Sequence, residues 1–229
     1  MTKPPSEGPS ENSLRPTVGW HVGHFFYRFD RKQLRSLGTS ELSDGCREFV
    51  SALEPRDGPT RIQTFAISGH KADFGLIAMD PDPLKVDGVH QRLLSCPLGS
   101  AIAPAFSFVS LTEISEYVPT LEQYGQELVA QGLDGKSEEY RTKLKQFERR
   151  LEIMRRQRLT PDLPAWPALC FYPMNKRRLA DANWFLLDFA ERQRLMGQHG
   201  ETGMKFAGKV TQLVTVAMGL DDWEWGVTL

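Results

Sequence analysis

One histidine is a candidate metal ligand. His199 precedes Gly200 at the expected end of a helix that also carries Leu195 and Met196. The C-terminus of a helix stabilises a protonated imidazole, whereas a metal needs a neutral ring nitrogen, so ligation requires burial or the metal itself to shift that balance. The ordinary interpretation, in which His199 donates to the last carbonyls of its helix, stays open beside the metal-ligand interpretation.

A tyrosine and a lysine follow each other along one expected strand. Tyr172 and Met174 share a face by strand alternation, and Lys176 follows two residues later. Pro173 keeps the backbone before it extended. A redox-active tyrosine beside a lysine could place a radical next to a bound carboxylate. The alternative is a tyrosine in a core strand followed by a basic turn in solvent, and the residue pattern alone favours this alternative.

An amide interrupts an apolar row in another expected strand. Alternation places Gln212 on the face that carries Val210, Val214, Val216 and Met218. A buried amide without a partner costs about 1 to 3 kcal/mol, so Gln212 must face either a polar partner in the core or a ligand cavity. The sequence has no P-loop, GxGxxG, HExxH or GxSxG motif, which removes support for nucleotide-binding, zinc-protease and esterase functions.

The composition is that of an ordinary globular protein. The chain has 229 residues, of which 40 % are hydrophobic and 25 % charged, and its net charge is -1. These values argue against a collagenous, disordered or membrane protein, and they give no general attraction for nucleic acid. Cys46, Cys96 and Cys170 are far apart and odd in number. They disfavour a disulfide framework or a zinc cluster, and a reducing cytoplasm fits best.

The first half of the chain has the order βαββαβ. The predicted strands are 20–29, 61–67, 73–79 and 105–111, and the predicted helices are 31–53, broken near Gly38, and 84–96. This order is typical of a ferredoxin-like unit, in which helices cover one face of an antiparallel sheet. The uncharged stretch 93–112 has the length of a membrane span, but prolines and glycine interrupt it, so no span is predicted.

The region 117–158 lacks strand signals and predicts a helical insertion. Ser137 is the expected N-cap of a helix whose apolar residues recur at steps of four and three, at Tyr140, Leu144, Phe147, Leu151 and Met154. Eight basic residues stand against two acidic ones over 141–158. A solvated outer face is favoured over an anion-binding surface for such a charge run.

The second half repeats part of the first. Its predicted strands are 168–174, 184–187, 209–218 and 223–229, with a helix from the N-cap Asp188 to His199. By comparison with the first half, this copy is expected to lack its last helix and strand. The predicted organisation is a disordered tail over 1–16, a ferredoxin-like half over 17–117, a helical insertion over 118–160 and an incomplete C-terminal half over 161–229.

Several motifs resemble the coproheme decarboxylase branch of the chlorite dismutase-like family. They are FYPMNKRR at 171–178, NW at 183–184, ERQRLM at 191–196, HG at 199–200, AGKV at 207–210, Gln212 and DWEWGVTL at 222–229, with looser agreement in the first half. The resemblance implies an α+β fold, specifically a dimeric α+β barrel with two ferredoxin-like halves in each chain. It also implies assembly into a homopentamer in the cytoplasm.

The family's activity implies an enzyme of haem biosynthesis. Hydrogen peroxide drives oxidative decarboxylation of iron coproporphyrin III, which serves as substrate and cofactor, and the product is haem b. By resemblance, His199 is the proximal iron ligand. Tyr172 is the catalytic radical tyrosine and acts with Lys176, while Arg158 and Lys176 bind propionates.

The resemblance also assigns the rest of the porphyrin site. The residues that line the porphyrin edge are Tyr172, Pro173, Met174, Asn175 and Lys176, and Gln212 lies on the distal side. Chlorite-decomposing relatives carry an arginine at that distal position, and a neutral amide holds an anion less strongly, so chlorite dismutation is disfavoured. The alternatives are a non-catalytic haem- or porphyrin-binding relative and a truncated, inactive product.

Overall fold

The computed structural model describes residues 14–54 and 56–229, which form two compact α+β units. The first unit contains the described residues up to 112 together with 215–222, and the second contains 113–214 together with 223–229. The mixed α+β class expected from the sequence is confirmed. Residues 1–13, most of the predicted disordered tail, lie outside the described residues.

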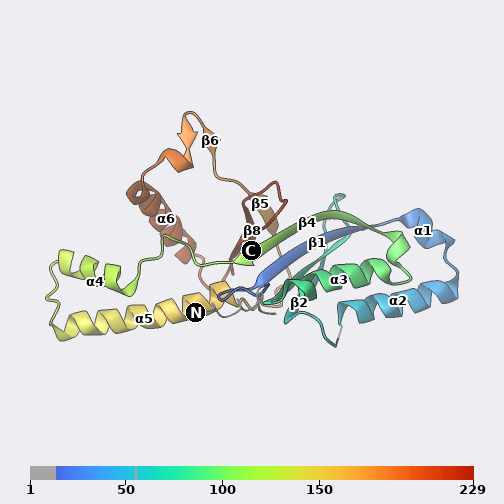
Figure 1. The fold of residues 1–229 in the computed structure, drawn as a ribbon, viewed down its shortest axis with the longest axis horizontal. Helices are drawn as coiled ribbons and strands as arrows, with labels where there is room; N and C mark the ends of the chain where they lie inside the picture. Colours follow the sequence, from blue (N-terminus) through green and yellow to red (C-terminus); the bar gives the residue numbers. More distant parts are fainter. Residues whose placement is uncertain (1–13, 55) are drawn as a thin grey trace, which may run out of the picture. The chain divides into compact units, whose positions relative to one another are not determined.

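An antiparallel sheet forms the first unit. β1 (His21–Phe29) pairs with β3 (Phe74–Asp80) on one side and with β4 (Ile102–Thr112) on the other. β2 (Arg61–Ala66) pairs with the outer side of β3. The resulting strand order, β2-β3-β1-β4, is the order expected of a ferredoxin-like unit. Figure 1 shows β1 and β4 side by side. Residues 215–217 then pair with the end of β4.

Helices pack on one face of this sheet. They are α1 (Arg31–Ser36), α2 (Thr39–Leu53) and α3 (Pro83–Ser95), and the short 3-10 helix η1 (Gly99–Ala101) leads into β4. The expected break near Gly38 is confirmed, because the Gly38 amide donates to the Glu41 carboxylate and a new helix begins there. Phe25, Tyr27 and Leu76 point from the sheet into a core that α2 and α3 complete.

The second unit combines a helical pair with a smaller strand pair. Its elements are α4 (Leu121–Ala130), α5 (Glu138–Leu159), β5 (Phe171–Met174), β6 (Arg178–Leu179), β7 (Ala182–Asn183), the 3-10 helix η2 (Trp184–Leu186), α6 (Phe189–Met204), the start of β8 (Leu213–Ala217) and β9 (Trp225–Thr228). β5 pairs with β9, and β6 pairs with β7. In the described part of the chain, no helix is both long and apolar enough to cross a membrane.

The apolar seam of α5 is the surface on which α4 packs. The rings of Tyr124 and Phe147 stack with their centroids 4.0 Å apart. At Gly125, a Cβ atom would lie 2.6 Å from the Tyr140 hydroxyl oxygen, so glycine permits the close approach of the two helices. The regularly spaced apolar residues of the helical insertion therefore join two helices of the same unit.

Three predictions in the second half are wrong in their details. The expected strand 184–187 is instead the 3-10 helix η2, because the Asn183 side chain accepts from the Phe185 amide and turns the chain. The expected strand 209–218 is shortened to β8, since turns follow α6 as far as residue 209. The helix expected to end at His199 continues to Met204, because Gly200 keeps helical geometry.

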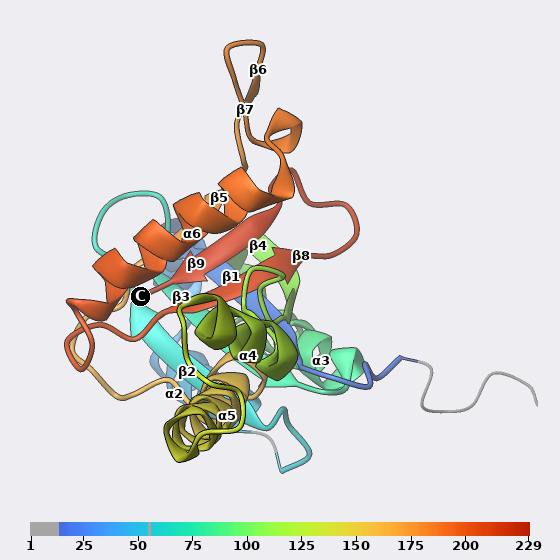
Figure 2. The same ribbon diagram turned by 90° about the vertical axis from the view of Figure 1, so that its left-hand side faces the viewer.

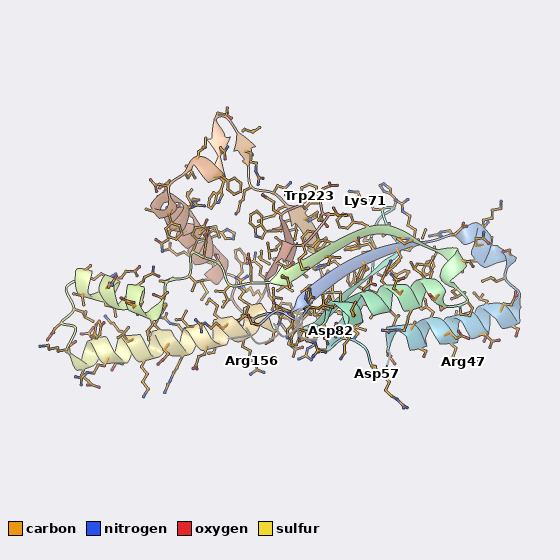
Figure 3. All side chains as sticks on the ribbon, viewed as in Figure 1. Arg47, Asp57, Lys71, Asp82, Arg156 and Trp223 are labelled. Atoms are coloured by element: carbon orange, nitrogen blue, oxygen red, sulfur yellow. The ribbon has the colours of Figure 1, made fainter. Side chains whose placement is uncertain are left out.

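Replacement of Asp80 by alanine should destabilise the first unit strongly. The buried Asp80 carboxylate accepts from the Thr60 amide at 2.9 Å, the Thr60 hydroxyl at 2.7 Å and the Asp82 amide at 2.8 Å. Because the substitution leaves these donors without their acceptor, we expect Asp80→Ala to lower the free energy of unfolding by about 2 to 4 kcal/mol in urea denaturation. Asp57→Ala, in the exposed loop after α2 (Figure 3), should change it little, and equal effects would contradict the assignment.

Candidate functional site

A cavity of about 740 Å³ lies wholly within the second unit. Its wall is built by α5, α6, β5, β9, η2, the segment 113–118 and the chain entering β8. Cavities of about 300 to 1,000 Å³ are typical of small-molecule and cofactor sites. The apolar part of the wall includes Met154, Leu195, Met196, Val214, Trp225 and Val227. The cavity therefore has the size and lining for a largely apolar ligand.

The pairing of β5 with β9 supplies one wall of the cavity. Tyr172 lies opposite Val227, and Met174 lies opposite Trp225. Directly opposed residues in a sheet share a face, and all four side chains line the cavity. Tyr172 is 42 % exposed, so the interpretation of this tyrosine as a buried core residue is wrong.

Pro173 and Asn175 do not line the cavity. Pro173 lies opposite Gly226 and alternates with Tyr172 and Met174, so it belongs to the other face of the strand. The side-chain oxygen of Asn175 accepts from the Glu224 amide at 2.7 Å. Pro173 and Asn175 therefore belong to the strand and turn that support the cavity wall. Their expected contact with a ligand remains a prediction.

Lys176 is held over two indole rings at the end of β5. Its Nζ atom lies 4.6 Å from the centroid of the Trp184 ring and 5.6 Å from that of Trp225. The Glu224 carboxylate accepts from the Lys176 amide at 2.8 Å and also pairs with Arg178. Burial lowers the pKa of the Lys176 ammonium, and the charge of Glu224 opposes this effect. The ammonium is thus fixed at the cavity and partly removed from water.

Arg158 brings a second cation to the cavity from the last turn of α5. Burial lowers the pKa of its guanidinium, and none of the described carboxylates forms an ion pair with it. Arg156, on the same helix, is exposed (Figure 3). The interpretation of the charge run as a solvated face therefore holds for Arg156 but not for Arg158. A half-buried cation without an acid beside it is suited to an anionic group of a ligand.

One face of α6 lines the cavity. Arg192, Leu195, Met196 and His199 follow each other at steps of three, one and three, which places them on the same side of a helix. Figure 2 shows the course of α6, drawn in orange. Asp188 caps the helix by accepting from the Glu191 amide at 2.8 Å.

The His199 side chain has no hydrogen bond or ion pair with the described residues. It therefore does not bond the last carbonyls of α6, which continues beyond it to Met204. Its distance from the helix end also weakens the dipole argument for a protonated ring. An imidazole nitrogen at this cavity can bind a metal brought by a ligand.

Gln212 lies on the cavity wall just before β8, in a half-buried position next to Val214 along the same face. Of the two interpretations of this amide, the structure matches the ligand cavity. The sequence also suggested that Val210 shares its row, but β8 begins only at residue 213 and Val210 is 45 % exposed.

Several cavity residues were not found by sequence reasoning. Glu113 follows β4, and its carboxylate accepts from the Trp225 indole N–H at 3.3 Å. Burial raises the pKa of Glu113, the hydrogen bond from Trp225 lowers it, and the charge of Glu116 raises it further. Trp184 and Arg192 also line the cavity. The only sequence signal for Glu113 is a carboxylate at the end of an apolar strand, which is too common to predict a site.

Comparison with known proteins places this chain in a family. The family model described as chlorite dismutase matches residues 40–229. A protein of Natronomonas pharaonis, provisionally named as heme-binding, is 33 % identical over 220 residues, which cover 92 % of this chain. The chain spans only a third of the length of that relative, 33 %.

Solved structures of heme-binding and chlorite dismutase proteins are also similar to this chain. A heme-binding protein from Thermus thermophilus is similar with a TM-score of 0.66 and 31 % identity, and the match covers 92 % of this chain and 76 % of that one. A variant of chlorite dismutase from Candidatus Nitrospira defluvii shares the fold with a TM-score of 0.64 at 15 % identity, over 95 % of this chain and 78 % of its own.

Substitution of Glu113 by glutamine should stabilise the protein at neutral pH and not at acidic pH. The raised pKa means that ionisation of Glu113 costs more free energy in the folded state than in the unfolded state. The ionised side chain therefore destabilises the folded state once the pH has risen above 4.5, the ordinary pKa of the group, and above its raised pKa in the folded protein. Glutamine still accepts from Trp225 but carries no charge. We expect Glu113→Gln to raise the free energy of unfolding at pH 7 by less than about 1 kcal/mol, because the group is only partly buried, and to leave it unchanged below pH 4.

Glu122→Gln, on the exposed first turn of α4, is the matched control for this pH profile. Urea denaturation of both variants across the pH range measures the effect. A gain for Glu113→Gln that persists below pH 4 would show that a buried charge is not its cause.

Proposed function

Because this chain belongs to the chlorite dismutase family, we propose that it binds iron coproporphyrin III and converts it to haem b by peroxide-dependent oxidative decarboxylation. One observation carries the proposal. Tyr172, Lys176, Arg158, His199 and Gln212 come from different parts of the second unit and all line a single cavity. The heme-binding relatives support a porphyrin as the ligand.

The cavity residues fit an iron porphyrin better than a free metal ion. In the described ranges, no group of three or more His, Cys, Asp or Glu side chains could hold a metal ion. An iron porphyrin brings four nitrogen ligands of its own, so one imidazole such as that of His199 is enough. The apolar wall suits the macrocycle, and the half-buried cations Arg158 and Lys176 suit its carboxylates.

In this proposal, each residue has a separate task. An imidazole nitrogen of His199 holds the iron, while Arg158 and Lys176 hold propionate carboxylates. Tyr172 lies on the same strand face as Met174, ahead of Lys176, so a carboxylate bound by that lysine would lie near the tyrosine. Tyr172 would act as a phenoxyl radical, after its hydroxyl hydrogen atom has been lost to the peroxide-derived oxidising chemistry that the iron porphyrin supplies. The phenoxyl oxygen would then accept the hydrogen atom that is removed from the propionate side chain, which restores the phenol.

The overall reaction balances with hydrogen peroxide as the only oxidant. Each propionic acid side chain and one hydrogen peroxide give one vinyl group, one carbon dioxide and two water molecules, and the reaction occurs twice. When bound, the iron porphyrin supplies the oxidising chemistry. The protein positions the carboxylates and excludes water from them. Gln212 offers no charge for an anionic oxidant, which favours decarboxylation over chlorite decomposition.

Reconstitution of the full chain tests this function against non-catalytic porphyrin binding. The protein is loaded with iron coproporphyrin III and titrated with hydrogen peroxide, and the pigment is analysed by mass spectrometry. Loss of two carbon dioxide equivalents supports decarboxylation. A bound but unchanged pigment supports the non-catalytic alternative, and failure to bind any porphyrin overturns both.

Tyr172→Phe should separate binding from chemistry. The phenylalanine ring keeps the apolar contact with the cavity but has no hydroxyl hydrogen to exchange. We expect binding of iron coproporphyrin III to stay within about twofold and decarboxylation to fall at least about a hundredfold. The control is Tyr140→Phe on the seam of α5, which should keep full turnover. Retained turnover in Tyr172→Phe would refute its catalytic role.

His199→Ala should affect iron binding selectively. Removal of the imidazole takes away the protein's iron ligand, so the Soret band of bound iron coproporphyrin III should shift and affinity should fall about tenfold or more. Affinity for the metal-free porphyrin, measured by fluorescence, should stay the same. His70→Ala, in the loop between β2 and β3, provides the control. An unshifted Soret band in His199→Ala is the result that would remove this residue from the iron.

A further inference from the structure

A third cation of the cavity, Arg192, has only a long ion pair with an acid. Its Nε atom is buried and has no hydrogen-bond partner among the described residues. The nearest carboxylate oxygen, on Glu116, lies 3.8 Å from Nη1, which is too far for a hydrogen bond. The Glu116 side chain is 60 % exposed, whereas that of Arg192 is only 23 % exposed. One buried N–H group of the guanidinium is therefore left without a partner in the second unit.

The surroundings of Arg192 are aromatic. Its guanidinium carbon lies 5.8 Å from the centroid of the Phe189 ring, and the Tyr117 ring stacks on that same ring with the two centroids 5.6 Å apart. Aromatic rings cannot satisfy the in-plane N–H groups of a guanidinium. These groups form a planar fork whose geometry matches the two oxygens of a carboxylate.

The position of Arg192 on α6 relates it to the expected iron ligand. Arg192 precedes His199 by seven residues, and both line the cavity from the same helix face. Seven residues of α-helix span ~10 Å along the axis. This spacing is comparable to the distance from the centre of a porphyrin to the carboxylates at its edge. A ligand whose metal lies at His199 can thus reach Arg192 with a carboxylate.

The cavity wall carries more basic than acidic side chains, which favours the binding of such a carboxylate. The wall holds three basic side chains, Arg158, Lys176 and Arg192, against two acids, Glu113 and Glu116. Glu113 accepts from the Trp225 indole, and no ion pair joins it to Arg192 among the described residues. Glu116 is the only one of the two acids near Arg192, and its contact is long.

We propose that Arg192 is a further carboxylate-binding residue of the porphyrin site. In the complex, a carboxylate of the ligand replaces Glu116 as the ion-pair partner of Arg192. The proposal rests on the proposed function, because a porphyrin is the ligand. With Arg158 and Lys176, the site then offers three carboxylate-binding cations. A porphyrin with four propionates can engage all three, whereas haem b has only two, so Arg192 determines specificity for the substrate.

Metal-free porphyrins test this role without iron ligation or turnover. Coproporphyrin III and its tetramethyl ester, which carries no charge, are titrated into the full chain and followed by porphyrin fluorescence. Arg192→Gln should weaken binding of the tetra-acid about tenfold or more, the effect of one lost charge-assisted hydrogen bond, and should leave ester binding unchanged. Arg192→Lys should recover part of the loss.

Two further variants make the test specific. Arg194→Gln removes a cation from the same helix that pairs with Glu191 outside the cavity, so it should not change either affinity. Glu116→Gln removes the competing acid, so it should tighten binding of the tetra-acid several-fold and again leave the ester unchanged. Opposite effects of Arg192→Gln and Glu116→Gln on the tetra-acid, together with no effect of Arg194→Gln, are the result expected if the two side chains act on the ligand's carboxylate.

The possible failures are distinguishable. If the unaltered chain binds neither porphyrin, the proposed function fails, and the role of Arg192 fails with it. If the chain binds coproporphyrin III and Arg192→Gln binds it equally well, only the role of Arg192 is overturned. If Arg192→Gln loses affinity for acid and ester alike, the residue has a structural role and the proposal is also overturned.

Discussion

The antiparallel pairing of β5 with β9 is the constraint on which the cavity depends. Its register places Tyr172 and Met174 beside Val227 and Trp225 on one face. A slip by one residue would turn all of these side chains away from the cavity. The register is fixed beyond the strands as well, because the backbones of Cys170 and Leu229 exchange two hydrogen bonds, at 3.0 and 2.8 Å.

Glu224 connects the backbone of this strand pair to the charged residues that follow β5. Its amide donates to the Met174 carbonyl at 3.3 Å and to the side-chain oxygen of Asn175. Its carboxylate accepts a hydrogen bond from the Lys176 amide and forms an ion pair with Arg178. One residue thus ties the end of the strand pair to the turn that follows β5. The Lys176 ammonium is consequently held over indole rings and not extended into solvent, although a lysine side chain loses much conformational freedom when it is fixed in this way.

Sequence reasoning found the residues whose role follows from local periodicity. Strand alternation placed Tyr172, Met174 and Lys176 together, and the polar interruption of an apolar row identified Gln212. It missed Arg192, because helical spacing gives the relative positions of side chains but not which face of α6 borders a cavity. The glycine after His199 did not end the helix, since glycine permits a left-handed turn without requiring one. The glycine with positive φ lies later, at Gly208.

Charge placement in the cavity favours a ligand over the empty protein. Arg158 and Lys176 both have their pKa lowered by burial, so the folded chain bears a cost for holding these cations away from water. The charge of Glu224 offsets part of this cost at Lys176. An acid placed beside Arg158 would do the same there, but it would also compete with a ligand's carboxylate. The two acids on the wall are arranged to compete weakly, because Glu113 is bonded to Trp225 and Glu116 is mostly in solvent. The folded protein is therefore less stable than it would be with these cations neutralised, and the cations remain available to bind a ligand's carboxylates.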